Sequence, residues 1–278
     1  MYKNRNNRAG QAVLIVLLSL SVVLVVVMYI LSRSITDISL STKDDDSLRA
    51  FSAAEAGIEK ALVVGSSSDS DFEGASFTAD VSSFGNSKLV VYPFNLKSGE
   101  IATFWFTRPS ETPFTGNQIQ LCWGDAGTGV SSSTTPAIEF SIYYGPVTNL
   151  QIARATFDPY IYRPQGDFLN NFASAQNATC TIGNEVFQFN QTFNLNTLGA
   201  SSNLQFATVK MLYNTAVGHK VGLNVNFGGN SNLPTQGSVI DSTGKYGDSN
   251  RRISVYQLHP VIPPIFTNAL YSGTGIVK

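Results

Sequence analysis

Charged residues are scarce in this sequence, and neither sign dominates. Only 13% of the 278 residues are Asp, Glu, Lys or Arg, and the formal net charge is −1. Proteins that bind nucleic acid usually carry a basic patch or stripe, because contacts to the phosphate backbone supply much of their affinity. The composition offers no broad electrostatic footprint of that kind. We therefore expect no nucleic acid among the partners.

Histidine is nearly absent, which limits the catalytic chemistry that the sequence indicates. The two histidines, His219 and His259, lie far from any cysteine or carboxylate pair at metal-ligand spacing, so a zinc site has little support. No G-x-S-x-G elbow, P-loop or G-x-G-x-x-G motif follows a predicted strand. We expect that the protein is not an enzyme and that it needs no organic cofactor.

The sequence contains one long hydrophobic run near its N-terminus. Residues 12–31, AVLIVLLSLSVVLVVVMYIL, contain no charged side chain. At the rise of an α-helix they span about 30 Å, which is the thickness of a bilayer core. The run therefore predicts a transmembrane helix.

The flanks of this run favour one orientation in the membrane. Lys3, Arg5 and Arg8 precede it, whereas only Arg33 and Lys43 follow closely. Positive charge remains on the cytoplasmic side, so we expect a cytoplasmic N-terminus and an extracytoplasmic remainder. A cleaved signal peptide is the alternative, but the run is longer than a usual h-region and ends without a small-residue cleavage pattern.

The helical pattern continues well beyond the predicted span. No proline or glycine interrupts the chain between residue 31 and Gly57, and Leu48, Phe51, Ile58 and Leu62 form one apolar stripe at helical spacing. Gly65 provides a stop signal after Val64. The sequence thus predicts one helix over residues 11–64 whose second half is amphipathic.

The phrase LRAFSAAEAGIEKAL, residues 48–62, makes the N-terminal region similar to type IV pilin-like proteins. It most closely resembles PilX-type minor pilins, in which an apolar span leads into a phrase close to AFxAAEAGxxxAL. The matching positions are Ala50, Phe51, Ala53, Ala54, Glu55, Ala56, Gly57, Ala61 and Leu62. The resemblance covers about the first 62 residues.

This resemblance implies a processing site near the N-terminus. Residues 1–10 would be a leader that a prepilin peptidase removes after Gly10, which leaves Gln11 as the mature N-terminus. Major pilins usually have phenylalanine first and glutamate fifth after the cut, where this chain has Gln11 and Ile15. The missing glutamate favours a minor, priming or tip subunit over a bulk filament subunit.

The same resemblance implies roles for residues of the amphipathic half. Phe51, Glu55, Gly57, Ile58 and Leu62 are the candidates for helix packing and assembly, and we expect Phe51, Ile58 and Leu62 to pack on the protein's own sheet. Glu55 lies on the apolar stripe. Two alternatives remain for this carboxylate, a contact within the protein or a contact between subunits.

After a polar linker, residues 65–75, the pattern changes to β-structure. Ile119, Leu121 and Trp123 alternate with polar or small residues, and Ser-, Thr-, Gly- and Asn-rich breaks separate such segments. We expect one antiparallel β-sandwich-like domain over residues 76–278, and hence an α+β protein. Further strands are expected at 88–96, 100–108, 139–145, 150–157, 185–195, 204–212, 222–228 and 251–258.

Cysteine is as rare as histidine. Cys122 and Cys180 are the only two, and both fall in the region expected outside the membrane. An even pair in an oxidising compartment favours a disulfide. Two separate buried thiols are the alternative.

A metal site is a further candidate in the predicted linker. In DSDFEGASFTAD, residues 69–80, Asp69, Asp71, Glu73 and Asp80 take alternate or terminal positions of a calcium loop, and Gly74 takes the turn position. Oxygen ligands in this pattern suit Ca²⁺, although the usual long bidentate glutamate at the end is replaced by aspartate. A solvated acidic linker is the alternative.

Together these features predict a minor, priming or tip subunit of a type IV pilus-like filament. Its expected partners are other pilin subunits, a prepilin peptidase and the inner membrane, with a surface ligand for the β domain as a further option. The first alternative is a single-pass membrane-anchored binding protein or adhesin that does not polymerise. The second is a pseudopilin of a secretion machine.

Overall fold

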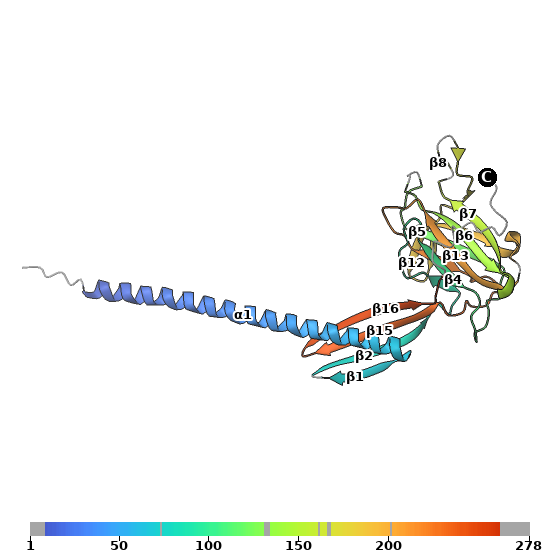
Figure 1. Ribbon diagram of the computed structural model, residues 1–278. Helices are drawn as coiled ribbons and strands as arrows, with labels where there is room; N and C mark the ends of the chain where they lie inside the picture. Colours follow the sequence, from blue (N-terminus) through green and yellow to red (C-terminus); the bar gives the residue numbers. More distant parts are fainter. Residues whose placement is uncertain are drawn as a thin grey trace, which may run out of the picture. The chain divides into compact units, whose positions relative to one another are not determined.

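The computed structural model describes residues 9–72, 74–130, 134–160, 162–165, 168–200 and 202–261. It has an α+β fold, with one long N-terminal helix followed by antiparallel and mixed β-sheets (Figure 1). The chain forms two compact units. The first, here called the stalk unit, contains the residues up to Val81 together with Ile240–Val255. The second, the sandwich unit, contains Ser82–Val239 and the residues from Tyr256 onward.

Helix α1 (Ala9–Val64) contains 56 residues and is about 84 Å long at the standard rise. It ends where the sequence predicts. Gly65 takes the left-handed conformation, with φ of 73°, and its N–H donates to the Ala61 carbonyl oxygen at 2.8 Å. Glycine adopts this conformation without a steric penalty, so it caps the last turn.

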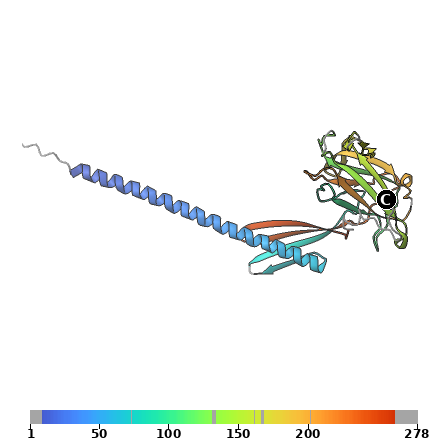
Figure 2. The ribbon, with the colours of Figure 1, turned by 45° about the horizontal axis from the view of Figure 1, so that its top comes forward.

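The stalk unit pairs the end of α1 with a four-stranded sheet, here called the stalk sheet, in the order β1-β2-β15-β16. Figures 1 and 2 show the C-terminal part of the helix lying along one face of this sheet. Phe77, Ala79 and Ile240 from the sheet pack with Ile58 and Ala61 from the helix. The strands are β1 (Ser68–Phe72), β2 (Ala75–Phe84), β15 (Gly237–Tyr246) and β16 (Ser249–Leu258).

The sandwich unit contains two five-stranded sheets, β10-β7-β6-β13-β4 and β11-β12-β5-β14-β3, and a two-stranded sheet, β8-β9. The elements are β3 (Leu89–Val91), β4 (Ile101–Trp105), β5 (Gln118–Asp125), β6 (Ala137–Tyr144), η1 (Val147–Asn149), β7 (Gln151–Asp158), β8 (Pro164–Gln165), β9 (Phe168–Leu169), β10 (Ala173–Ser174), β11 (Cys180–Ile182), β12 (Glu185–Asn194), η2 (Leu195–Leu198), β13 (Leu204–Leu212) and β14 (Val221–Asn224).

The core of the sandwich unit lies between the two five-stranded sheets. Phe104 and Phe140 from one sheet and Leu121, Trp123 and Phe189 from the other are all at most 1% exposed. The indole N–H of Trp123 donates to the Pro136 carbonyl oxygen at 3.0 Å, so its polar atom is satisfied although the ring is buried. The inward positions of β5 are those that its alternating pattern predicts.

Two expected boundaries are wrong. The predicted linker at residues 65–75 contains β1, which pairs with β2 in an antiparallel hairpin. The region expected to be one β domain, residues 76–278, is divided, because most of β2, β15 and β16 belongs to the stalk unit. The physical reason is that helix α1 packs on one face of β2 and β15. These strands therefore bury their apolar side chains against the helix and not in the core of the sandwich unit. Residues 262–278 lie outside the described residues.

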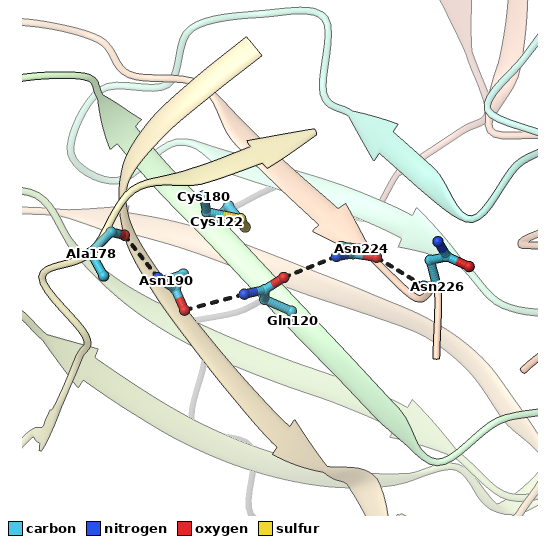
Figure 3. The surroundings of a disulfide bond; sticks show 7 residues. All are labelled: Gln120, Cys122, Ala178, Cys180, Asn190, Asn224 and Asn226. Carbon is cyan, nitrogen blue, oxygen red and sulfur yellow. Dashed lines mark hydrogen bonds between the residues drawn. A yellow bond between two sulfur atoms is a disulfide. The ribbon is translucent and has the colours of Figure 1, made fainter. Parts of the chain in front are cut away.

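Cys122 of β5 and Cys180 of β11 form a disulfide with a Cα–Cα distance of 6.0 Å. Beside it, four hydrogen bonds run across the sheet in one direction (Figure 3). Asn190 Nδ2 donates to the Ala178 carbonyl oxygen at 2.8 Å, Gln120 Nε2 to Asn190 Oδ1 at 3.2 Å, and Asn224 Nδ2 to Gln120 Oε1 at 2.9 Å. The Asn226 N–H completes the row at Asn224 Oδ1, at 2.8 Å. The disulfide and this amide row hold the segment around Cys180 against the sheet.

Removing the disulfide is expected to lower the free energy of unfolding of the sandwich unit by about 4 kcal/mol, because the bridge closes a loop with a sequence separation of 58. Urea denaturation of the full chain with and without a thiol reductant measures this change. A Cys122→Ser/Cys180→Ser variant is the control, since the reductant should not alter its midpoint. An unchanged midpoint in the wild-type chain would contradict the prediction.

Candidate membrane anchor and assembly helix

Helix α1 is the only helix among the described residues that is long and apolar enough to cross a membrane. Every side chain from residue 12 to residue 45 is exposed. The hydroxyl groups within the apolar run are satisfied locally, since Ser19 Oγ donates to the Val16 carbonyl oxygen at 2.9 Å and Ser21 Oγ to that of Leu18 at 2.8 Å. This removes the cost of placing them in hydrocarbon. The helix is thus compatible with a single-pass membrane anchor.

The face of α1 that contacts the stalk sheet is built from small residues. Ala50, Ala53, Ala54 and Ala61 are at most 1% exposed, and Gly57 is also buried. Their spacings of three, four and seven place them on one side of the helix. Side chains of this size let the helix backbone approach the strands closely.

Two glycines show how close this approach is. A Cβ atom on Gly244 of β15 would overlap the Ala50 carbonyl oxygen and the Ala54 nitrogen, which are backbone atoms of the helix. A Cβ atom on Gly57 would lie 2.9 Å from Cδ2 of the Phe77 ring. The helix and β15 therefore meet at van der Waals distance without side chains between them.

This packing corrects part of the expected helix contact. Ile58 is buried at 7% exposure and Gly57 is buried beside it, but Phe51 is 44% exposed and Leu62 is 42% exposed. The expectation that Phe51 and Leu62 pack on the protein's own sheet is wrong. The reason is steric, since the alanine and glycine face allows a shorter helix-to-sheet distance than a face of Phe and Leu. Glu55 is exposed as well.

The exposed part of the predicted stripe borders a groove. Phe51, Glu55, Ile58 and Glu59 line its helix side, and Ile253 and Val255 of β16 line the other side. Ile58, Ile253 and Val255 also contribute to the apolar cluster of the stalk unit. The groove is therefore apolar at its base, with two carboxylates on the helix side.

Polar contacts hold the start of the packed segment. Arg49 Nε lies 3.0 Å from Asp45 Oδ2, and its guanidinium stacks 5.0 Å from the centroid of the Tyr246 ring. Arg251 Nε donates to Ser47 Oγ at 2.8 Å. The Arg49–Asp45 pair lies within the helix. The contacts of Arg49 with Tyr246 and of Arg251 with Ser47 join the helix to β15 and β16, and sequence reasoning missed them because these partners are about 200 residues apart.

Between the apolar run and the packed segment lies a stretch of α1 that no described element covers. Residues 32–45 are all exposed, and Asp46 and Ser47 are half-buried. Ile35 and Ile38 are 67% and 64% exposed. At 1.5 Å per residue, positions 32–45 extend for about 21 Å.

The candidate processing site lies at the start of the described chain. Gly10 and Gln11 fall within the first turn of α1. Cleavage between them stays a prediction.

The candidate calcium residues are spread along a hairpin. Asp69 and Asp71 lie in β1 and Asp80 in β2, where Asp69 pairs with Thr78 and Asp71 with Ser76, while Glu73 lies outside the described residues. In the part of the chain that the structure describes, no group of three or more His, Cys, Asp or Glu residues is placed to hold a metal ion. Calcium binding stays a prediction.

No protein-family model, curated protein or solved structure matches this chain.

Proposed function

We propose that the protein is a minor, priming or tip subunit of a type IV pilus-like filament. In this proposal α1 anchors the chain with its N-terminus in the cytoplasm, the stalk and sandwich units lie outside, and assembly uses the outward side of the helix. The protein acts by packing and display, without catalysis. Partners would be other subunits of the filament and a prepilin peptidase.

The observation that carries the proposal is how little of α1 its own sheet buries. Over residues 12–64 of the helix, where the structure describes burial, the buried residues are Ala50, Ala53, Ala54, Gly57, Ile58 and Ala61. A bilayer accounts for the apolar run at residues 12–31 but not for the stretch that follows. A long helix with exposed Ile, Leu and Phe side chains in water is poorly stabilised, because most helical stability in proteins comes from tertiary packing. Contacts with neighbouring helices would supply that packing.

The division of residues around the helix supports the same function. Small residues attach it to the stalk sheet, whereas Leu48, Phe51 and Leu62 remain outside at 66%, 44% and 42% exposure. The large apolar side chains are thus exposed and available to a partner, while the small residues pack the helix on its own sheet. Gln11 and Ile15, in place of the phenylalanine and glutamate of major pilins, favour a minor subunit.

The disulfide supports the extracytoplasmic placement of the sandwich unit. Structural disulfides form and persist in oxidising compartments and are rare where thiols are kept reduced. Cys122 and Cys180 are bonded and at most 6% exposed, which is typical of a structural bridge. This placement agrees with the basic residues that precede the apolar run.

Processing is the first test. Expression with a prepilin peptidase is expected to yield a mature chain that starts at Gln11, measured by intact mass and N-terminal sequencing. Expression without the peptidase should leave the full chain. Gly10→Val is the control, because a branched side chain at the cut is expected to block entry into the protease cleft.

A chain that stays uncut in the presence of active peptidase would overturn the proposal. The membrane-anchored binding protein would then be the better account. If processing occurs, co-purification with a pilus supports the proposed role, whereas co-purification with a secretion complex indicates a pseudopilin.

A further inference from the structure

We propose that the stalk sheet continues from one copy of this chain to the next, with β1 of a second copy pairing along the free edge of β16. This inference rests on the proposed function in one respect, which is that all copies point in the same direction in the membrane. It names the surface through which the subunits meet outside the membrane. The partner is a second copy of this chain.

Both edges of the stalk sheet are open. Strands β1 and β16 are the terminal members of the sheet, and among the described residues no strand pairs with the outer side of either. Strand β16 is ten residues long, and Arg252, Ser254 and Tyr256 on it are exposed. A long edge strand presents a row of unpaired N–H and C=O groups that can take up another strand.

The two edges carry opposite charge on the same side of the sheet. Asp69 and Asp71 of β1 are exposed and alternate with Ser70, which is opposite Phe77 on the helix side. They therefore point away from the helix.

Arg252 of β16 points away from the helix too. Its side chain is 66% exposed and reaches Asp241 of β15 at 3.1 Å, while its neighbour Ile253 packs in the cluster on the helix side. The Ser254 hydroxyl, which donates to the Asp241 carboxylate, and Arg252 keep the pKa of Asp241 below its ordinary value. Because Arg252 is mostly exposed, it can also face a carboxylate of an added strand.

The helix sides of the two edges are complementary as well. Phe72 at the end of β1 is 47% exposed, and its partner Ala75 belongs to the buried face of β2. Phe72 therefore lies on the helix side. Along β16, that side carries the apolar groove lined by Phe51, Ile58, Ile253 and Val255. An aromatic side chain on one edge thus meets an apolar groove on the other.

The direction of the added strand follows from the order of the stalk sheet. Strands β1 and β2 are antiparallel. The Gln236 N–H donates to the Phe84 carbonyl oxygen at 2.7 Å, so the end of β2 meets the start of β15, and these two are antiparallel also. Residues 247–248 join β15 and β16 as a tight hairpin. Directions therefore alternate, and β1 of a copy that points the same way is antiparallel to β16.

One register satisfies both sides of the pairing. If Phe72 of the second copy is opposite Ile253, its ring faces the groove. Asp71 of that copy is then opposite Ser254 and diagonal to Arg252, which is within reach of a long side chain. The two patches differ, so the contact is heterologous, and each copy of a pair keeps one edge of its stalk sheet open.

Cysteine pairs test this contact in the full chain. In one copy β1 and β16 are separated by β2 and β15, so their backbones are about 14 Å apart, beyond the reach of a disulfide. A chain with Asp71→Cys and Ser254→Cys should therefore form a ladder of covalent multimers after oxidation in the membranes of the expressing cell, seen on a non-reducing gel. Native Cys122 and Cys180 are already bonded.

Three controls make the outcome decisive. Each single cysteine variant should give no ladder, and Asp80→Cys with Ser254→Cys should give none, because Asp80 is exposed on β2, which is not an edge strand. Absence of a ladder in the Asp71→Cys/Ser254→Cys chain would overturn the proposal. A cross-link to a different protein would overturn the identity of the partner.

Charge reversal is a second test of the same register. Asp69 and Tyr256 are opposite each other in this register and both are exposed, so a chain with Asp69→Cys and Tyr256→Cys should give the ladder while Asp71 and Arg252 stay intact. With that ladder as readout, Arg252→Asp should reduce cross-linking several-fold, whereas Lys245→Asp on β15 should not. Asp71→Arg combined with Arg252→Asp should restore it. Equal loss in the Lys245 control, or no rescue, counts against the pairing.

These results are separable from the test of the proposed function. A ladder in chains that the peptidase leaves uncut would support the sheet contact and reject the pilin role. Processing after Gly10 without a ladder would do the reverse.

Discussion

Replacing Gly244 by alanine is expected to detach helix α1 from the stalk sheet and to cost about 3 kcal/mol in the free energy of unfolding of the stalk unit. The added Cβ atom would overlap the carbonyl oxygen of Ala50 and the nitrogen of Ala54. Backbone atoms in the middle of a helix cannot move aside as a flexible side chain can. The helix and β15 must therefore separate, which opens the alanine face to water. Hydrogen exchange of the amides of β2 and β15 measures the effect.

Gly228→Ala is the matched control. Nothing lies within 4 Å of a Cβ atom at Gly228, so the same change in chain entropy occurs there without the overlap. We expect unchanged exchange in the stalk unit of this variant. If Gly244→Ala exchanged no faster than Gly228→Ala, the close contact between helix and strand would not be what holds the stalk unit together.

The second large effect is expected in the sandwich unit, where Arg163→Met should lower the free energy of unfolding by about 3–5 kcal/mol. Asp158 is 0% exposed, and Arg163 Nε lies 2.8 Å from its Oδ2 atom. Asn170 Nδ2 and the Tyr160 N–H also donate to this carboxylate, at 2.6 and 2.8 Å. Methionine has a similar volume but no charge, so the carboxylate would remain buried without its cation. Chemical denaturation of the full chain measures the loss.

Arg154→Met on strand β7 is the control for this ion pair. Arg154 Nε lies 3.9 Å from Glu139 Oε1, and its side chain is 51% exposed. Exposed pairs contribute about 0–1 kcal/mol, because water screens the charges and the side chains lose entropy. Similar losses for both variants would contradict the prediction, because only Arg163→Met leaves a buried carboxylate without its cation.

These two predictions bear on different parts of the proposed function. The Gly244 contact keeps the helix attached to the stalk sheet, whereas the Arg163 pair maintains the unit that would be displayed. We therefore expect Gly244→Ala to impair incorporation into filaments. Arg163→Met should impair the displayed sandwich unit while leaving the helix and its processing site intact.

Local sequence determined the helix and several strands. The uncharged run at residues 12–31 and the cap at Gly65 predict α1 and its end, because both depend on neighbouring residues alone. The alternation of Ile119, Leu121 and Trp123 predicts β5 and its inward face for the same reason. The candidate for a disulfide followed from having two cysteines, although only the fold places Cys122 and Cys180 within 6.0 Å (Cα–Cα).

Other strands were missed because their local pattern is weak. Strand β15, GSVIDSTGKY, contains two glycines and few apolar residues, and it resembles a loop by composition. Two of its buried positions, Ser242 and Gly244, are small, and the helix backbone lies close against Gly244. By local composition β1 resembles a linker with a calcium site, since its Asp and Ser residues are typical of loops. Pairing with distant strands stabilises these segments, and no local window contains that information.

The face that α1 buries, and so the surface left for partners, was decided by tertiary structure alone. Sequence periodicity predicts that the large hydrophobic side chains of α1 face the stalk sheet, and this would have buried Phe51 and Leu62. In the structure the alanine face of α1 lies against the sheet instead. Gly244 and the alanines allow the backbones of the helix and of β15 to approach more closely than large side chains would permit. The sequence by itself determined that an apolar helix continues into an amphipathic one. Which side of it stays exposed depended on a glycine about 190 residues further along the chain.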